Sequence, residues 1–124
     1  MLVILPLTTL VFPSFLEELL FRGLLIPHPS EQPSRAALAF AIALSTLLFV
    51  LWHPLNAAMF NHTAQVMFND LRFLSMAAVL GIACGIAYAR SGSLWVPVVM
   101  HWITVLLWIL LLGGRNVVAG IVPG

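Results

Sequence analysis

Four long apolar stretches fill most of this chain, and they restrict it to helices packed within a lipid bilayer. They run over residues 2–26, 36–52, 71–89 and 95–112, and the second holds no charged residue. A helix needs roughly 20 apolar residues to cross a bilayer. Only 7% of the residues are charged, against about a quarter in a soluble domain, so the chain cannot cover a surface that faces water. The sequence therefore predicts an all-α, multi-pass transmembrane bundle of about four spans.

The segments between these stretches predict where the spans end. Residues 27–34 contain three prolines, which exclude a continuous helix there. His53 and Pro54 are expected to end the second span, because proline lacks a backbone donor. Residues 55–70 mix large apolar side chains with amides, which predicts one interfacial segment with a short helix on the membrane surface.

The third stretch carries a small residue at every fourth position: Ala77, Gly81, Gly85 and Ala89. Such a stripe lets the backbone of another helix approach closely. No internal repeat or linker divides the chain, so residues 1–124 are expected to form a single domain with a loose tail at 113–124. The net charge of +1 gives no reason to expect nucleic acid. The expected partner is the lipid bilayer, the cell membrane if the source is bacterial, and the oligomeric state is left open.

Two adjacent acids interrupt the first stretch. Glu17 and Glu18 are half of all the acids in the chain, and an ionisable group within a bilayer costs at least a few kcal/mol, so it indicates function. Ser14 and Glu17 fit a capping box, which predicts that a helix restarts at Ser14. Glu18 and Arg22 are four residues apart and should pair on one helix face. Glu17 points about 100° away from Glu18, has no local partner, and suits a general base. The alternative is that both acids and Arg22 form a buried network for helix packing.

Two histidines lie in or beside apolar stretches. His101 lies within the fourth stretch and needs a hydrogen-bond partner or a metal ion there. The alternative is a polar contact that joins two helices. His53 follows the uncharged second stretch, and the alternative for it is an interfacial side chain at the end of a helix. Phe49 lies four residues before His53, on the same face, where it would either pack as core or wall off a pocket.

These residues can support hydrolysis in two ways, and their spacing does not choose between them. Glu17, His53 and His101 could hold a divalent metal such as zinc, with water in the open position. Without a metal, Glu17 would take a proton from water, His53 would orient that water, and His101 would donate to the oxyanion. The chain has no HExxH, no GxSxG and no paired intramembrane aspartates. These absences argue against site-2-type metalloproteases, rhomboid-type serine proteases and presenilin-type aspartyl proteases, respectively.

The motifs resemble those of a known family. The run Glu17-Glu18-Leu19-Leu20-Phe21-Arg22 matches an EExxxR motif, Phe49 and His53 match FxxxH, and the run from Gly92 to Pro97 followed by His101 resembles the approach to a third motif, HxxxN or HxxxD. These three motifs, in this order on successive apolar spans, are similar to those of the CPBP intramembrane proteases. That family comprises CAAX proteases and bacteriocin-processing enzymes, including Rce1-like and Abi-like proteins. The resemblance covers residues 12–110.

The resemblance implies an intramembrane endopeptidase, glutamate-dependent or metal-dependent, whose substrate is a membrane-associated peptide or protein. It implies that Glu17 activates water beside His53, that Glu18 and Arg22 support this glutamate, and that His101 helps to form the oxyanion site. The family usually has further helices before the first motif, so this core is expected to be a minimal or a truncated member.

One position departs from the family pattern. Val105 stands four residues after His101, where the third motif has Asn or Asp, and a valine side chain cannot donate a hydrogen bond. Thr104 is adjacent but faces elsewhere on the helix, and Asn56 is the candidate to supply the missing amide. Val105 favours the alternative of a non-catalytic membrane scaffold or bacteriocin-immunity-type protein of the same fold. A third alternative is a small ion or proton conductor.

Overall fold

The computed structural model describes residues 4–112, and every element in that part of the chain is helical. The first apolar stretch forms one interrupted helix, built from α1 (Ile4–Thr9), a π-helical segment (Leu10–Phe15), α2 (Leu16–Glu18) and a second π-helical segment (Leu19–Gly23). The prediction of an all-α bundle is confirmed. The expected loose tail at 113–124 lies outside the described residues.

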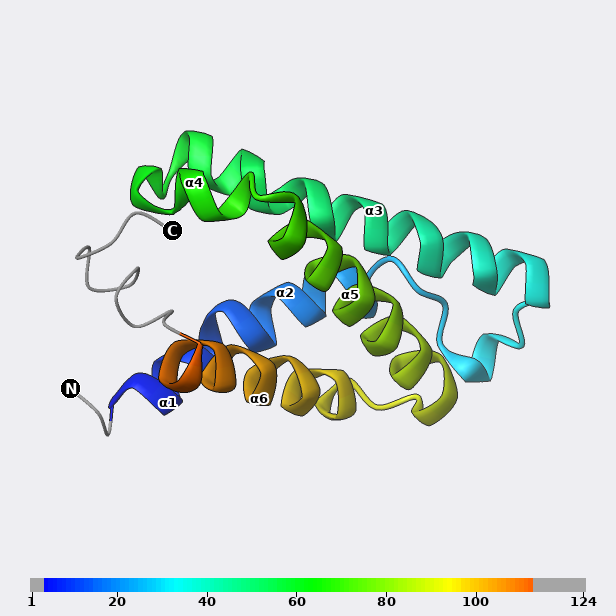
Figure 1. Ribbon diagram of the computed structural model, residues 1–124. Helices are drawn as coiled ribbons and strands as arrows, with labels where there is room; N and C mark the ends of the chain where they lie inside the picture. The colour runs from blue at the N-terminus through cyan, green and yellow to red at the C-terminus, as the bar shows by residue number, and fades with distance from the viewer. Residues whose placement is uncertain (1–3, 113–124) are drawn as a thin grey trace.

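Three longer helices complete the bundle: α3 (Arg35–Met59), α5 (Leu71–Ser91) and α6 (Trp95–Leu111). The first helix (Ile4–Gly23), α3 and α5 are long and apolar enough to cross a membrane, while α6 is apolar but shorter. In Figure 1, α3 and α5 run in opposite directions, and α6 lies alongside the interrupted first helix. Large apolar side chains on all of these helices face outward, as expected for a multi-pass membrane protein.

Local capping residues set several helix ends. The Ser34 hydroxyl accepts a hydrogen bond from the backbone N–H of Ala37 at the start of α3. Asp70 caps α5 by accepting from the N–H of Arg72 at 2.8 Å. Gly92 follows α5 with φ of 66°, a left-handed conformation that glycine adopts without steric cost. This glycine makes the short turn into α6.

The second span does not end at Pro54. The helix α3 continues to Met59 with Pro54 inside it, so that expectation was wrong. Proline removes one backbone hydrogen bond, here to Val50, and neighbouring groups can compensate for this in a membrane helix. The His53 ring turns back to the Phe49 carbonyl, at 2.8 Å, beside the carbonyl that Pro54 leaves without a donor.

The first part of the predicted interfacial segment, residues 55–59, therefore belongs to α3. The remainder forms a 3₁₀ turn (His62–Ala64) and α4 (Gln65–Phe68). A short helix is present as expected, and its place at a lipid interface stays a prediction. Ala64 and Met67 are buried and pack against Trp108 near the end of α6, so this segment closes one end of the bundle.

Another helix approaches the small-residue stripe of α5, as predicted, and the structure shows that this helix is α3. A Cβ atom at Gly85 would lie 3.0 Å from Cγ2 of Ile42, and one at Gly81 would lie 3.1 Å from Cγ2 of Thr46. The two helices therefore approach closely at these glycines. This contact brings the middle of α3 and α5 over the polar residues of the first helix.

Candidate active site

A break in the first helix precedes the two acids. Phe12 has extended backbone angles, with φ of −136° and ψ of 123°, because a residue before proline is disfavoured in the helical region. Pro13 then lies at the start of the renewed helix, where a proline sacrifices no hydrogen bond. The expected capping box was wrong, since the Ser14 hydroxyl is buried without a hydrogen-bond partner in the described part of the chain. The restart is set by Phe12 and Pro13, the two residues that precede Ser14.

Glu18 joins the first helix to α6. It is fully buried, and its Oε1 accepts hydrogen bonds from Arg22 Nη1 at 3.2 Å and from His101 Nδ1 at 2.7 Å. The predicted pair of Glu18 and Arg22 is present, and the partner that His101 requires is Glu18. Because an ionised carboxylate can only accept, Nδ1 of His101 carries the proton in this contact.

Glu17 receives its contacts from two other helices. Its Oε1 accepts a hydrogen bond from Trp52 Nε1 on α3 at 3.1 Å. Its Oε2 lies 3.6 Å from His101 Nε2 and has no hydrogen-bond partner among the described residues. Glu17 is 6% exposed. One carboxylate oxygen is thus fixed, and the other remains available beside an imidazole nitrogen.

Arg22 lies between α3 and α5. Its guanidinium carbon lies 4.4 Å from the centre of the Phe49 ring, a cation–π contact. A Cβ atom at Gly81 would lie 3.1 Å from Arg22 Nη2, so the glycine leaves the room that the guanidinium occupies. The Nε and Nη2 atoms of Arg22 have no hydrogen-bond partner in the described structure.

Phe49 links the two histidines. Its fully buried ring makes edge contacts with His53 and His101, at centroid distances of 4.9 and 5.6 Å. His53 is also surrounded by Phe68 and Phe73, and its Nδ1 bonds to the Phe49 carbonyl. Phe49 therefore packs as core and contacts both histidine rings, and a pocket around His53 stays a prediction.

The amide expected to replace the missing third-motif residue does not reach the acids. Asn56 is half-buried, and its backbone carbonyl accepts from Phe60 and Asn61. Its side chain makes no hydrogen bond to the described site residues. Thr104 is exposed and donates to the Met100 carbonyl, which agrees with the expectation that it faces away.

The arrangement does not fit a three-ligand metal site. No group of three or more His, Cys, Asp and Glu side chains in residues 4–112 is close enough to hold a metal ion. Glu17 and His101 approach each other, but Phe49 intervenes before His53, and Glu18 already uses Nδ1 of His101. The observed site is thus a cluster of Glu17, Glu18, Arg22 and His101, which we call the acid–imidazole cluster.

Trp52 and Gly81 were missed by the sequence argument. Trp52 occupies a variable position of the FxxxH pattern, and Gly81 was assigned only to helix packing. Polarity could have singled out Trp52, because a buried indole N–H in an apolar helix needs an acceptor.

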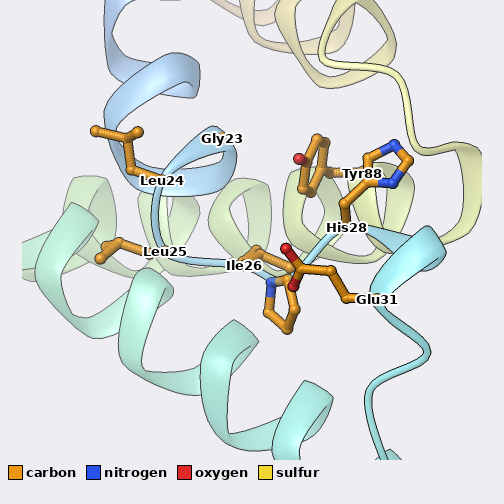
Figure 2. A pocket seen from close by; sticks show the side chains of 8 residues that line it. Gly23, Leu24, Leu25, Ile26, His28, Glu31 and Tyr88 are labelled. Carbon is orange, nitrogen blue, oxygen red and sulfur yellow. The ribbon is translucent and has the colours of Figure 1, made fainter.

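A separate pocket of about 300 Å³ lies at the end of the first helix, and its lining includes none of the acid–imidazole cluster. Figure 2 shows His28 and Tyr88 side by side at one edge of it, with Glu31 nearby. His28 bonds through Nε2 to the Gly92 carbonyl at 3.0 Å, so it ties this loop to the turn before α6. The pocket therefore belongs to the loop region, apart from the acids.

Comparison with known proteins agrees with the motifs. A family model described as type II CAAX prenyl endopeptidase, Rce1-like, matches residues 1–107. No curated protein and no solved structure gives a significant match. Since the family match covers most of the chain, this protein belongs to the Rce1-like family of type II CAAX prenyl endopeptidases, a family of intramembrane proteases.

Proposed function

We propose that this protein hydrolyses peptide bonds of membrane-associated substrates through water activated by Glu17. The observation that carries the proposal is the free Oε2 of Glu17, which is buried and lies 3.6 Å from His101 Nε2. A water molecule placed beside this pair can lie within hydrogen-bonding distance of both atoms, which is the geometry that general-base catalysis requires.

The reaction assigns a place to each proton. Oε2 of Glu17 takes one proton from water as the oxygen of that water bonds to the scissile carbonyl carbon. The tetrahedral intermediate then collapses, the C–N bond breaks, and the proton held by Glu17 passes to the leaving nitrogen. The products are a carboxylic acid and an amine, so the step needs no further reactant.

Donors for the developing oxyanion are available within the cluster. His101 can donate through Nε2 when that atom carries a proton, and Arg22 retains two nitrogens without partners. Removing one oxyanion donor typically costs about a hundredfold or more in rate. Val105 supplies none, so we expect His101 and Arg22 to carry more of this stabilisation than in family members with the third-motif amide.

The family description, which names a prenyl endopeptidase, supports a proposal for the substrate class. We propose a prenylated CAAX-type peptide, whose lipid would lie in the bilayer and bring the scissile bond to the membrane-embedded acids.

Substitution of the proposed base tests this function. Purified protein in liposomes is given an internally quenched peptide that ends in farnesylcysteine and three further residues, together with its unprenylated counterpart. Glu17→Gln should abolish cleavage while membrane insertion and folding persist. Glu31→Gln, which removes an exposed acid from the loop, should cleave like the wild type. Cleavage retained by Glu17→Gln would refute the role of Glu17, and equal cleavage of both peptides would refute the prenylated substrate.

Val105 favours a second function, that of a membrane scaffold or immunity-type protein with the same fold. In that case the wild type binds the peptide and does not cleave it. Binding of the quenched peptide without any gain in fluorescence would support the scaffold and overturn the hydrolase.

A further inference from the structure

The indole of Trp52 holds one oxygen of the proposed base. Trp52 lies on α3, one residue before His53, and its Nε1 is 3.1 Å from Glu17 Oε1. Among the described residues, Trp52 is the residue of another helix whose side chain donates a hydrogen bond to Glu17. The remaining contact of the carboxylate, at 3.6 Å from His101 Nε2, is longer than a hydrogen bond.

We propose that Trp52 is a positioning residue, which fixes Oε1 of Glu17 so that Oε2 faces His101 and acts as the base. This proposal rests on the proposed function. A glutamate side chain has several rotatable bonds, and a base displaced by about 1 Å can lose a hundredfold in rate. The hydrogen bond from α3 removes that freedom from the carboxylate.

The chemistry of indole suits this task. Its N–H is a donor only and does not titrate in the range where a carboxylate works. Trp52 can therefore orient Glu17 without exchanging protons with it. A histidine or a carboxylic acid at the same position would compete for the proton that the reaction transfers.

Without this contact, Glu17 has a competing partner nearby. Arg22 carries Nε and Nη2 atoms that have no hydrogen-bond partner in the described structure, and Arg22 lies on the helix that carries Glu17. Loss of the indole N–H would leave the carboxylate free to turn toward this guanidinium. Oε2 would then be occupied by a hydrogen bond and would lose its position beside His101.

The chain offers a matched control in Trp102. This residue adjoins His101 as Trp52 adjoins His53, and its Nε1 donates to the backbone carbonyl of Pro6 at 2.8 Å. Both indoles are half-buried and both link two helices. They differ in the acceptor, which is the proposed base for Trp52 and a backbone carbonyl for Trp102.

The test replaces one atom group at a time. Introducing 3-benzothienylalanine at position 52 keeps the shape of the ring and exchanges the N–H for sulfur. Since a displaced base loses rate without losing substrate binding, we expect kcat for the farnesylated peptide to fall at least about tenfold, with KM within about twofold of the wild type. The same replacement at position 102 should leave both constants unchanged. Trp52→Phe serves as the second variant and should show the same division between kcat and KM.

The possible results separate the role of Trp52 from the proposed function. A wild-type kcat at position 52, an equal loss at positions 52 and 102, or a change confined to KM would overturn the role of Trp52. Cleavage retained by Glu17→Gln, or absent in the wild type, would overturn the proposed function itself. An inactive Glu17→Gln beside a fully active position-52 variant would overturn only the positioning role.

Discussion

Gly81 offers a direct way to disturb the acid–imidazole cluster without changing any of its members. A Cβ atom added at this position would lie 3.1 Å from Arg22 Nη2, 3.1 Å from Thr46 Cγ2 and 3.3 Å from Phe49 Cδ1. These contacts are closer than carbon atoms normally accept, so the neighbours must move by a few tenths of an ångström. Phe49 is fully buried and cannot retreat freely, which directs the displacement toward Arg22.

The expected magnitude combines two opposing effects. Exchanging a helical glycine for alanine stabilises a helix by about 1 kcal/mol. Overpacking a buried contact costs about 1–3 kcal/mol. We therefore expect Gly81→Ala to lower the free energy of unfolding by between about 0 and 2 kcal/mol. The displaced guanidinium is hydrogen-bonded to Glu18, and Glu18 is hydrogen-bonded to His101. We therefore also expect the rate of cleavage to fall at least about tenfold.

Gly85→Ala is the matched control for this substitution. It lies one turn further along the same face of α5, where a Cβ atom would lie 3.0 Å from Ile42 Cγ2 and 3.4 Å from Ile26 Cδ1. It should therefore cost similar stability, measured by thermal unfolding in detergent, and leave cleavage of the farnesylated peptide near the wild-type rate. Equal activity of the two variants would refute the argument that Gly81 makes room for a functional guanidinium.

Three further changes test other parts of the site. Arg22→Leu leaves Glu18 buried without its cation and should destabilise the protein by about 3–5 kcal/mol, measured by thermal unfolding. The double variant Glu18→Leu with Arg22→Leu should recover much of that loss in stability. A double variant as unstable as Arg22→Leu alone would contradict this reasoning. Val105→Asn restores the amide of the third motif and should raise kcat, so an unchanged rate would show that the oxyanion site is complete without it. Treatment with 1,10-phenanthroline should leave cleavage unchanged, since the described residues assemble no three-ligand metal site, whereas inhibition reversed by added zinc would restore the metal mechanism.

The sequence predicted the elements of the fold better than their ends. Apolar length is sufficient to identify a membrane helix, and the stripe of small residues identified the face of α5 that α3 approaches. The end of α3 was predicted incorrectly. A proline removes one backbone hydrogen bond, and the remaining hydrogen bonds and packing of α3 are enough to continue the helix past Pro54. The helix restart was placed at Ser14 by a side-chain pattern, whereas the backbone restriction at Phe12 determines it.

The composition of the site was harder to predict, because it depends on distances between helices. The pair of Glu18 and Arg22 follows from four-residue spacing on one helix, and it is present at 3.2 Å. The contact of His101 with Glu18 joins residues that are 83 positions apart. Residue spacing within a single helix therefore cannot predict it. For the same reason His53, grouped with Glu17 by its chemical type, lies behind Phe49, and Trp52 contacts Glu17 instead.

Under the proposed function, the two glutamates have different roles, and His101 contacts both of them. Glu18 Oε1 lies 2.7 Å from Nδ1 of His101, so the other ring nitrogen, Nε2, is the one that faces Oε2 of Glu17. These two atoms lie 3.6 Å apart. In the proposed mechanism Oε2 of Glu17 takes a proton from water, and Glu18 would support this step by holding Nδ1 of His101, which leaves Nε2 facing Oε2.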